Sequence, residues 1–411
     1  ERWPVTMPMV FVAVGAITAG VGAIDVQAEI GLIAELAEIT LAVILFSDAI
    51  RIELPRLRRH LGLPARLLGV GLPLTIALGA AINALLFPER PFAEVALLAA
   101  VLAPTDAALG SAVVEDESVP LRDRLSLNVE SGVNDGLVVP IVAILTAMVL
   151  DENRTARSWV RFIAEQIGWG VAVGFVVGSL GVVLLTASRR RGWSDGRYEQ
   201  LATFALPILA LFAADAIGGN SFIAAFVGGL TFGSFHHRMP SEDPHATPTT
   251  LGEFTEDAAQ LLAVGAFFVF GNVLLGQVAE DITPAVIVCA VATLTVVRIL
   301  PVWIALTGTG LRWPSRLFIG WFGPRGLASI IFGLLLLEEF ESFVAGADDL
   351  FSVIAITVTA SVVLHGVTAA WGARTYGRWA DATDFTDDER EHMHMPAMSH
   401  VAVSPRWGTN R

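Results

Sequence analysis

The chain has 411 residues, of which 54% are hydrophobic and 16% are charged, and its mean hydropathy is +0.64. These values indicate a helical protein that crosses a membrane many times, and they exclude a large soluble domain. The single cysteine, Cys289, lies inside an apolar run, so an internal disulfide is excluded as well. The net charge of −14 predicts no nucleic-acid partner, because the acidic residues collect in loops and in the segment after Asp381.

Apolar segments long enough to span a bilayer predict twelve helices. They cover residues 4–24, 29–50, 66–87, 93–114, 121–150, 159–187, 198–216, 219–235, 255–276, 284–308, 316–338 and 350–373. The sequence begins at Glu1 rather than at a methionine and enters the first apolar run within a few residues. We therefore expect a further N-terminal segment to precede it.

Arginine placement predicts the orientation of these helices, since loops on the cytoplasmic side carry an excess of basic residues. All 26 basic residues are arginine. Twenty lie at the chain ends or in gaps that follow even-numbered helices, four lie in gaps after odd-numbered helices, and two lie within helices. The loop 51–66 and the C-terminus are therefore predicted to be cytoplasmic.

The predicted helix 121–150 carries an unusual number of polar residues near its middle. Ser131 and Asp135 share one face at i,i+4, and Glu130 and Asn134 share the neighbouring face. A charge inside a membrane costs several kcal/mol unless it is paired or hydrated, so it usually has a function. Oxygen-bearing side chains at this spacing predict a site for a hard cation.

Two other predicted helices are interrupted by proline. In the segment Ala103-Pro104-Thr105-Asp106, Pro104 leaves carbonyl groups unpaired beside a carboxylate. The segment Gly323-Pro324-Arg325-Gly326 interrupts a later helix in the same way, with a cation in place of the anion. Broken helices near the membrane centre are common ion sites in secondary transporters, where they cross as parts of inverted repeats. The alternative for the first segment is a simple proline kink with Asp106 facing the lipid headgroups.

Two further charged residues have candidate partners. Arg298 lies deep in the predicted helix 284–308, and a buried arginine keeps its charge and so needs a carboxylate. We expect that carboxylate to be Glu130. Asp48 either lies at the cytoplasmic end of helix 29–50, paired with Arg51, or reaches the ion path; the sequence leaves both interpretations open.

The segment after Ala380 is acidic and lacks aliphatic residues, which predicts a disordered tail. It contains the run His392-Met393-His394-Met395, whose side chains suit a soft metal. A solvated tail explains the same composition and is the preferred interpretation.

Together these motifs give the chain a resemblance to the NhaP-type sodium/proton antiporters, the prokaryotic relatives of the eukaryotic sodium/hydrogen exchangers. The resemblance covers residues 1–375. It is carried, in the order of the family, by Pro104-Thr105-Asp106, Glu130 to Gly136, Ser221 to Gly229, and Gly323-Pro324-Arg325-Gly326. It implies an all-α membrane fold with inverted repeats and two crossing interrupted helices, and one helix more at the N-terminus than the twelve present here.

Carried over to this sequence, the resemblance implies that Asp135 binds the cation and the proton in turn. Ser131 and the backbone at Thr105 would be further ligands of the sodium ion. Asp106 would act nearby, and Asp48 matches loosely a second acidic ligand of the family.

The resemblance also implies supporting roles. Asn134 would stabilise the broken helices, with Arg325 as the cation of the second break, and Glu130 and Arg298 would form a structural ion pair. One departure is Ala107, where relatives usually have a second proline. This leaves the length of the unwound stretch open.

The resemblance further implies a domain organisation and an assembly. A scaffold that forms a homodimer would comprise residues 1–65 and 151–283, with a linker helix in the second part. An ion-transporting core would comprise residues 66–150 and 284–375, and residues 376–411 would form a cytoplasmic tail.

The implied function is electroneutral exchange of Na⁺ or Li⁺ for H⁺ across the plasma membrane, by a transporter with no cofactor and no catalytic site. A K⁺-preferring exchanger is an alternative, as is a non-exchanging channel or ion sensor on the same scaffold. An intramembrane aspartyl protease would also need two membrane aspartates, but its motifs are Tyr-Asp and Gly-x-Gly-Asp. Here Asp106 and Asp135 follow Thr105 and Asn134.

Overall fold

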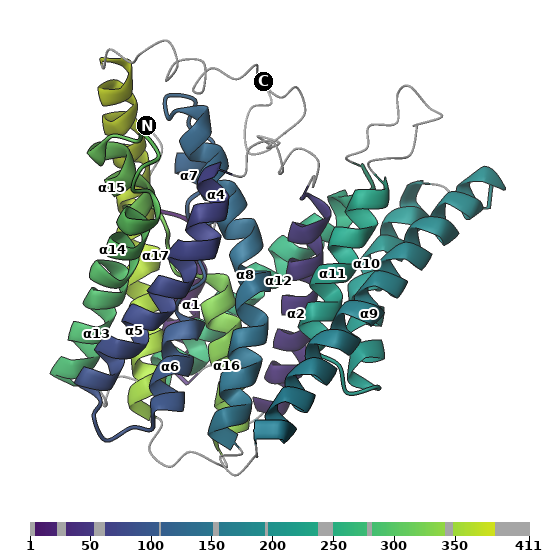
Figure 1. Cartoon of the computed structure of the whole chain (residues 1–411), viewed down its shortest axis with the longest axis horizontal. Helices are drawn as coiled ribbons and strands as arrows, with labels where there is room; N and C mark the ends of the chain where they lie inside the picture. The colour runs from purple at the N-terminus through teal and green to yellow at the C-terminus, as the bar shows by residue number, and fades with distance from the viewer. Residues whose placement is uncertain are drawn as a thin grey trace.

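Figure 1 shows a computed structural model of the chain. The structure describes residues 5–22, 30–52, 62–106, 108–150, 156–193, 196–236, 250–277, 282–341 and 348–382. Every regular element within these ranges is a helix. The elements are α1 (Met7–Gly20), α2 (Ile30–Ile50), α4 (Gly62–Arg66), η2 (Leu67–Gly71), α5 (Leu72–Leu86), α6 (Phe92–Val101), α7 (Ser111–Val114), α8 (Leu121–Leu150), α9 (Ala156–Arg190), α10 (Gly196–Asp215), α11 (Ser221–His236), α12 (Thr250–Gln277), α13 (Pro284–Leu294), α14 (Val296–Ala305), α15 (Trp313–Trp321), α16 (Leu327–Glu341) and α17 (Asp348–Asp381).

Each predicted apolar run coincides, apart from a few residues at its ends, with one of these helices or with two that follow each other in the chain. By length and hydropathy, six of the described helical segments are able to cross a membrane. They are Gly62–Leu86, Leu121–Leu150, Arg157–Arg190, Gly252–Leu275, Pro284–Ala305 and Asp348–Asp381. The all-helical membrane fold is therefore confirmed, and the count of twelve spans stays a prediction.

Two boundaries differ from the sequence prediction. The run 284–308 is divided at Thr295, whose backbone leaves the helical region at φ −114° and ψ −86°. The tail boundary predicted at 375 falls inside α17, which continues to Asp381. The helix continues there because Tyr376 is buried and stacks on Phe318, with ring centroids 4.0 Å apart. The His/Met run at 392–395 and Ala107 lie outside the described residues.

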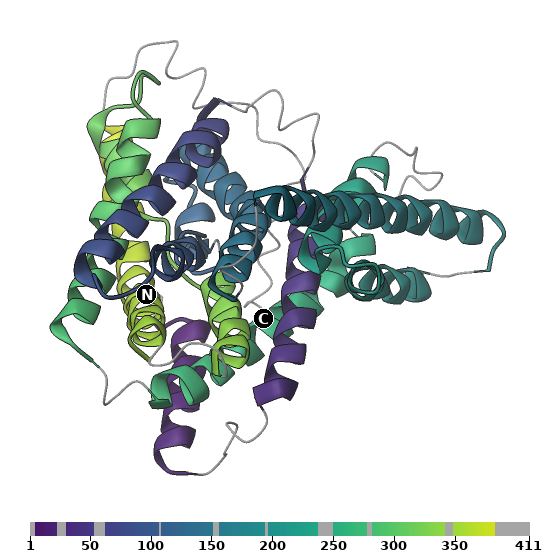
Figure 2. The same cartoon turned by 60° about the horizontal axis from the view of Figure 1, so that its bottom comes forward.

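The helices pack in two groups. In the first group, α2 contacts α10, α11 and α12, α9 packs on α10 and α11, and α1 packs along α12. Helices α5, α6, α8 and α13 to α17, with the short α4, η2 and α7, form the other group. In Figures 1 and 2, α9 to α11 lie on one side of the molecule and α5, α13 and α14 on the other. The groups meet where α2 contacts α8 and α16, and where α12 contacts α16 and α17.

Close helix packing depends on small residues in the first group. A side chain at Gly174 or Gly178 of α9 would collide with the backbone of α11. These glycines therefore allow the two helices to approach closely.

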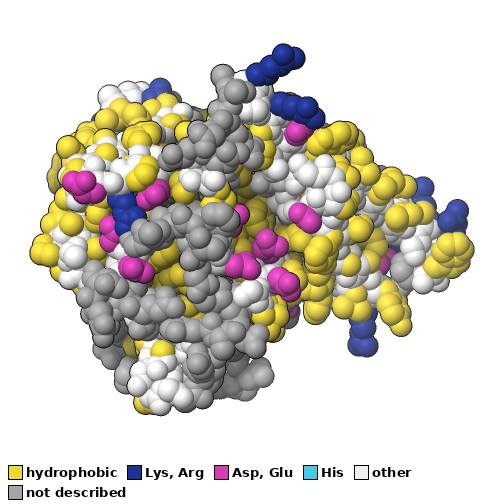
Figure 3. Space-filling model, turned by 90° about the horizontal axis from the view of Figure 1, so that it is seen from below, with side chains coloured by type: hydrophobic (Ala, Val, Ile, Leu, Met, Phe, Trp, Pro, Cys, Tyr) yellow, Lys and Arg dark blue, Asp and Glu magenta, His cyan; other side chains and the backbone are white. Residues whose placement is uncertain are grey.

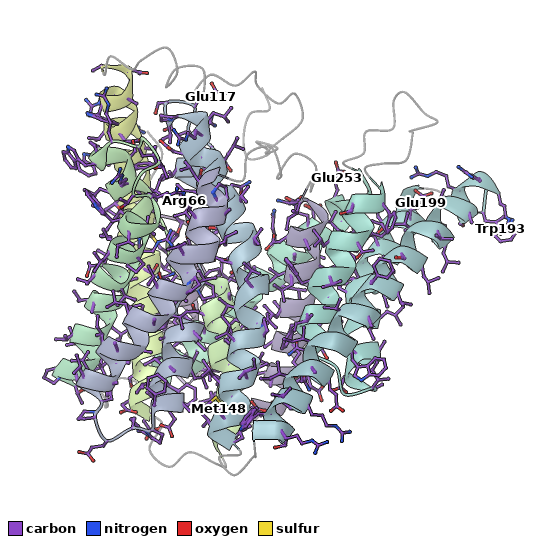
Figure 4. All side chains as sticks on the ribbon, in the orientation of Figure 1. Arg66, Glu117, Met148, Trp193, Glu199 and Glu253 are labelled. Carbon is purple, nitrogen blue, oxygen red and sulfur yellow. The ribbon has the colours of Figure 1, made fainter. Side chains whose placement is uncertain are left out.

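The connections between helices lie at opposite ends of the molecule. Arg66, Glu117, Glu199 and Glu253 lie towards one end, and Met148 lies towards the other (Figure 4). This alternation agrees with the arginine analysis, in which gaps after even-numbered and after odd-numbered predicted helices lie on opposite sides of the membrane. Figure 3 shows the face at the Met148 end, where acidic side chains gather near the middle.

Candidate ion-binding site

The centre of the second helix group is formed by two breaks that meet. Helix α6 ends at Val101 and α7 starts at Ser111, while α15 ends at Trp321 and α16 starts at Leu327. The backbone N–H of Asp106 donates to the carbonyl of Pro324, with 2.8 Å between nitrogen and oxygen. Ser329 of α16 donates to the carbonyl of Val101, at 2.7 Å. The two interrupted helices therefore contact each other at the breaks that the proline motifs predicted.

At this contact, charged side chains of opposite sign bind the backbone groups that the helix breaks leave without helical partners. The guanidinium of Arg325, which is fully buried, donates to the carbonyls of Ala103 and Pro104 just beyond the end of α6. In the other direction, Oδ2 of Asp106 accepts the backbone N–H of Leu327 at the start of α16, at 2.9 Å. A cation at helix carbonyls and an anion at a helix N-terminus are both favourable with respect to the helix dipole.

Asp106 is thus a helix cap in this structure. Its Oδ1 accepts the backbone N–H of Ala108 at 2.8 Å, so both carboxylate oxygens have backbone donors. A side chain at Gly326 would collide with this carboxylate. The hydrogen bonds to Asp106 account for its place at the break without a bound ion.

Beside the break lies a small oxygen-rich cluster that joins α8 to the unwound stretch. Oγ1 of Thr105 is 3.0 Å from Oγ of Ser131 and accepts a hydrogen bond from Nδ2 of Asn134 at 2.7 Å. Thr105, Ser131 and Asn134 are all buried. Oδ1 of Asn134 and Oδ1 of Asp135 are buried and have no hydrogen-bond partner in the structure. An unpartnered buried oxygen is costly, so this cluster is suited to accept a cation or a proton.

The carboxylate of Asp135 lies near two others. It interacts electrostatically with Asp48 of α2 and with Asp106. Asp48 also interacts with Arg51, yet Arg51 forms its ion pair with Glu256. Both interpretations of Asp48 therefore remain, because it lies near Arg51 and also near the cluster. Among the described residues, no three His, Cys, Asp or Glu side chains converge closely enough to chelate a metal.

The structure pairs Glu130 with Arg298. The two guanidinium nitrogens lie 2.5 Å and 2.8 Å from the two carboxylate oxygens, and both side chains are at most 5% exposed. The guanidinium also packs directly on Gly323, where a side chain would collide with it. Glu130 is therefore directed away from the cluster around Asp135, even though it lies on the neighbouring face of the same helix.

Sequence reasoning missed two polar networks. Ser361 and His365 of α17 are bonded to the break between α15 and α16. Near the C-terminal end of α17, the hydroxyl of Tyr376 lies 2.6 Å from Oδ2 of Asp123 and 2.7 Å from Oγ of Ser315. The available signal was that His365 and Asp123 are ionisable residues within predicted spans, which marks them for attention.

Both the sequence and the fold are similar to those of known proteins. A profile of the family described as sodium/hydrogen exchanger, transmembrane, matches residues 1–374. The solved structure of MjNhaP1, a sodium proton antiporter from Methanocaldococcus jannaschii, has the same fold, with a TM-score of 0.76 at 18% identity. The match covers 90% of this chain and 92% of that chain.

Two relatives are named as antiporters of different cations. The K(+)/H(+) antiporter NhaP2 of Shewanella baltica is 26% identical over 381 residues, which are 91% of this chain and 63% of that protein. A Na(+)/H(+) antiporter of Schizosaccharomyces pombe is 26% identical over 319 residues, 70% of this chain and 66% of that protein. The chain thus spans 63% of the length of the bacterial relative. Since the family profile matches nearly the whole sequence, this chain belongs to the sodium/hydrogen exchanger family of transmembrane transporters.

Proposed function

We propose that this protein exchanges a monovalent cation, Na⁺ or Li⁺, for H⁺ across a membrane, and that Asp135 binds the two in turn. The observation that carries the proposal is the buried Oδ1 of Asp135, which has no hydrogen-bond partner. Both oxygens of Asp106 accept backbone hydrogen bonds, and both oxygens of Glu130 accept from Arg298. Asp135 therefore keeps a carboxylate oxygen that is free to take a ligand.

The proposed ligands of the cation are Asp135, Ser131 and the backbone at Thr105. Hydroxyl, carbonyl and carboxylate oxygens suit a hard cation. One carboxylate holds either a dehydrated cation or a proton, so the two compete. Exchange follows if the loaded site opens alternately to the two sides of the membrane.

The packing of α8 supports alternating access. Helix α8 packs on α6 within its own group and on α2 and α11 of the other group. A side chain at Gly136, next to Asp135, would collide with the ring of Phe226 on α11. Asp135 therefore lies near the boundary between the two groups, and movement of one group along the other would change which side it faces. In our proposal residues 66–150 and 284–375 move, and the remaining helices form the scaffold of a homodimer.

One cation per proton is the proposed stoichiometry. The residue before Asp135 is the amide Asn134, and Glu130 is neutralised by Arg298. A single titrating carboxylate then moves one positive charge in each direction, so the cycle is electroneutral. We place the protein in the plasma membrane with a cytoplasmic C-terminus, on the basis of the arginine distribution.

Potassium is the second candidate cation. It is favoured by the Shewanella relative, which is a K(+)/H(+) antiporter, whereas the yeast relative is a Na(+)/H(+) antiporter. A channel or ion sensor on the same scaffold differs in one measurable property, because it cannot drive uphill proton movement from a cation gradient.

The test uses purified protein in proteoliposomes that contain a pH-sensitive dye. Gradients of NaCl, LiCl and KCl are applied separately, and the resulting internal pH change identifies the cation. Asp135→Asn should abolish exchange in a folded protein, because an amide is isosteric but cannot exchange charge. Asp257→Asn, at an exposed position, is the matched control and should exchange as the wild type does. A folded Asp135→Asn variant that still exchanges, or a wild-type flux that scales with membrane potential, would refute the assignment.

A further inference from the structure

A buried histidine on α17 is bonded to the break between α15 and α16. His365 is 1% exposed and Ser361, one turn before it, is 0% exposed. Nε2 of His365 lies 2.9 Å from the carbonyl oxygen of Trp321, the last residue of α15. Oγ of Ser361 accepts the backbone N–H of Arg325 at 2.7 Å. One turn of α17 therefore holds both sides of the non-helical stretch 322–326.

These partners define where the protons lie. A carbonyl oxygen only accepts, so Nε2 of His365 carries the hydrogen. The Ser361 hydroxyl already accepts from Arg325, and it donates its own proton to Nδ1 of His365, at 3.2 Å. In the neutral Nε2–H tautomer the Trp321 carbonyl, both ring nitrogens and the Ser361 hydroxyl each have a partner, and the Ser361 carbonyl oxygen, 3.0 Å from Nδ1, receives no proton from the ring.

A doubly protonated His365 would fit less well. Its Nδ1–H would have only the Ser361 carbonyl, at 3.0 Å, and the Ser361 hydroxyl would lose its acceptor. The ring would also become a third positive charge near Arg325 and Arg298, with both of which it interacts electrostatically. Burial, together with these two guanidinium groups, favours a neutral imidazole, whereas the carbonyls of Ser361 and Trp321 favour a protonated one.

We propose that Ser361 and the neutral His365 are positioning residues for cation binding. They hold stretch 322–326 so that the Arg325 guanidinium stays on the carbonyls of Ala103 and Pro104. Thr105, the next residue, is bonded to Ser131 of the cation cluster. A shift of Arg325 would therefore displace the oxygens beside Asp135.

The inference rests on the proposed function and deepens it. It is tested by the sodium dependence of exchange in proteoliposomes for Ser361→Ala, His365→Ala and His365→Gln. The control is Ser352→Ala, because Ser352 lies on the same helix, is equally buried, and has a hydroxyl with no hydrogen-bond partner.

We expect the apparent KM for sodium to rise about tenfold in Ser361→Ala and in His365→Ala, the effect of losing a buried hydrogen bond. Ser352→Ala should keep the wild-type KM. His365→Gln should recover most of the affinity, because a glutamine side chain reaches the Trp321 carbonyl with an N–H donor.

The proposed function and the positioning role fail in different ways. A wild-type protein that exchanges no cation refutes the proposed function itself. If the wild type exchanges, an unchanged KM in both alanine variants overturns the positioning role, and so does a lower maximal rate at unchanged KM. Equal loss in the glutamine and alanine variants overturns the assigned tautomer. If His365→Ala does not fold, Ser361→Ala against Ser352→Ala decides the question.

Discussion

The ion pair between Glu130 and Arg298 allows a quantitative test of the core. Both contacts of the pair are short and both side chains are at least 95% buried, so removal of one partner leaves an uncompensated charge. That loss is expected to cost about 3–5 kcal/mol. At about 2 °C per kcal/mol, the lower end of the range for large domains, Glu130→Ala and Arg298→Ala should each lower the apparent Tm by roughly 6–10 °C.

The double replacement should recover part of this loss, because no isolated charge remains. The assay is thermal unfolding of the purified variants in one detergent at one scan rate, arranged as a double-mutant cycle. Arg161 and Glu165 supply the matched control. Their side chains also form an Arg–Glu pair, at 2.7 Å, but are 78% and 46% exposed. Alanine variants of that pair should have the same apparent Tm as the wild type, because an exposed ion pair contributes little to stability. Additive losses for Glu130 and Arg298 would mean that the two charges do not compensate each other.

Two further predictions concern packing and orientation. Gly326→Ala should destabilise the protein and abolish exchange, since the new methyl group would collide with the carboxylate that caps α16, whereas Gly265→Ala, with no atom within 4 Å, should be tolerated. Normal thermal stability and flux in Gly326→Ala would contradict the contact between Asp106 and the start of α16. Cysteines placed at Arg58 and at Ala382, in a background with Cys289 replaced, should resist impermeant thiol reagents on intact cells, because both positions are predicted to be cytoplasmic. Labelling of either cysteine from outside would contradict the predicted orientation.

The sequence alone determined the class of fold and the positions of the two breaks. Hydropathy located the helical segments because a bilayer demands long apolar runs with internally bonded backbone. Pro104 and Pro324 marked the breaks because proline removes a backbone donor wherever it stands. A charge inside such a run is similarly informative, which is why Arg298 required a carboxylate.

Only the tertiary structure decided which partner each polar residue of α8 has. Glu130, Ser131 and Asp135 are neighbours on one helix, yet Glu130 pairs with α14, Ser131 bonds to the unwound stretch after α6, and Asp135 is left with an unpartnered oxygen. Helical spacing gives the face on which a side chain lies, but not the element that packs against that face.

The same reason explains what the sequence missed. His365 is one histidine in an apolar run, and its partner Trp321 is 44 positions away in the chain. The run 284–308 is divided at Thr295, but the sequence gives no signal for this, because residues 290–300 contain no proline or glycine. Local composition determines which backbone and side-chain groups of each segment need a partner within the membrane. The packing of distant helices decides which groups become those partners, and which carboxylate oxygen is left without one.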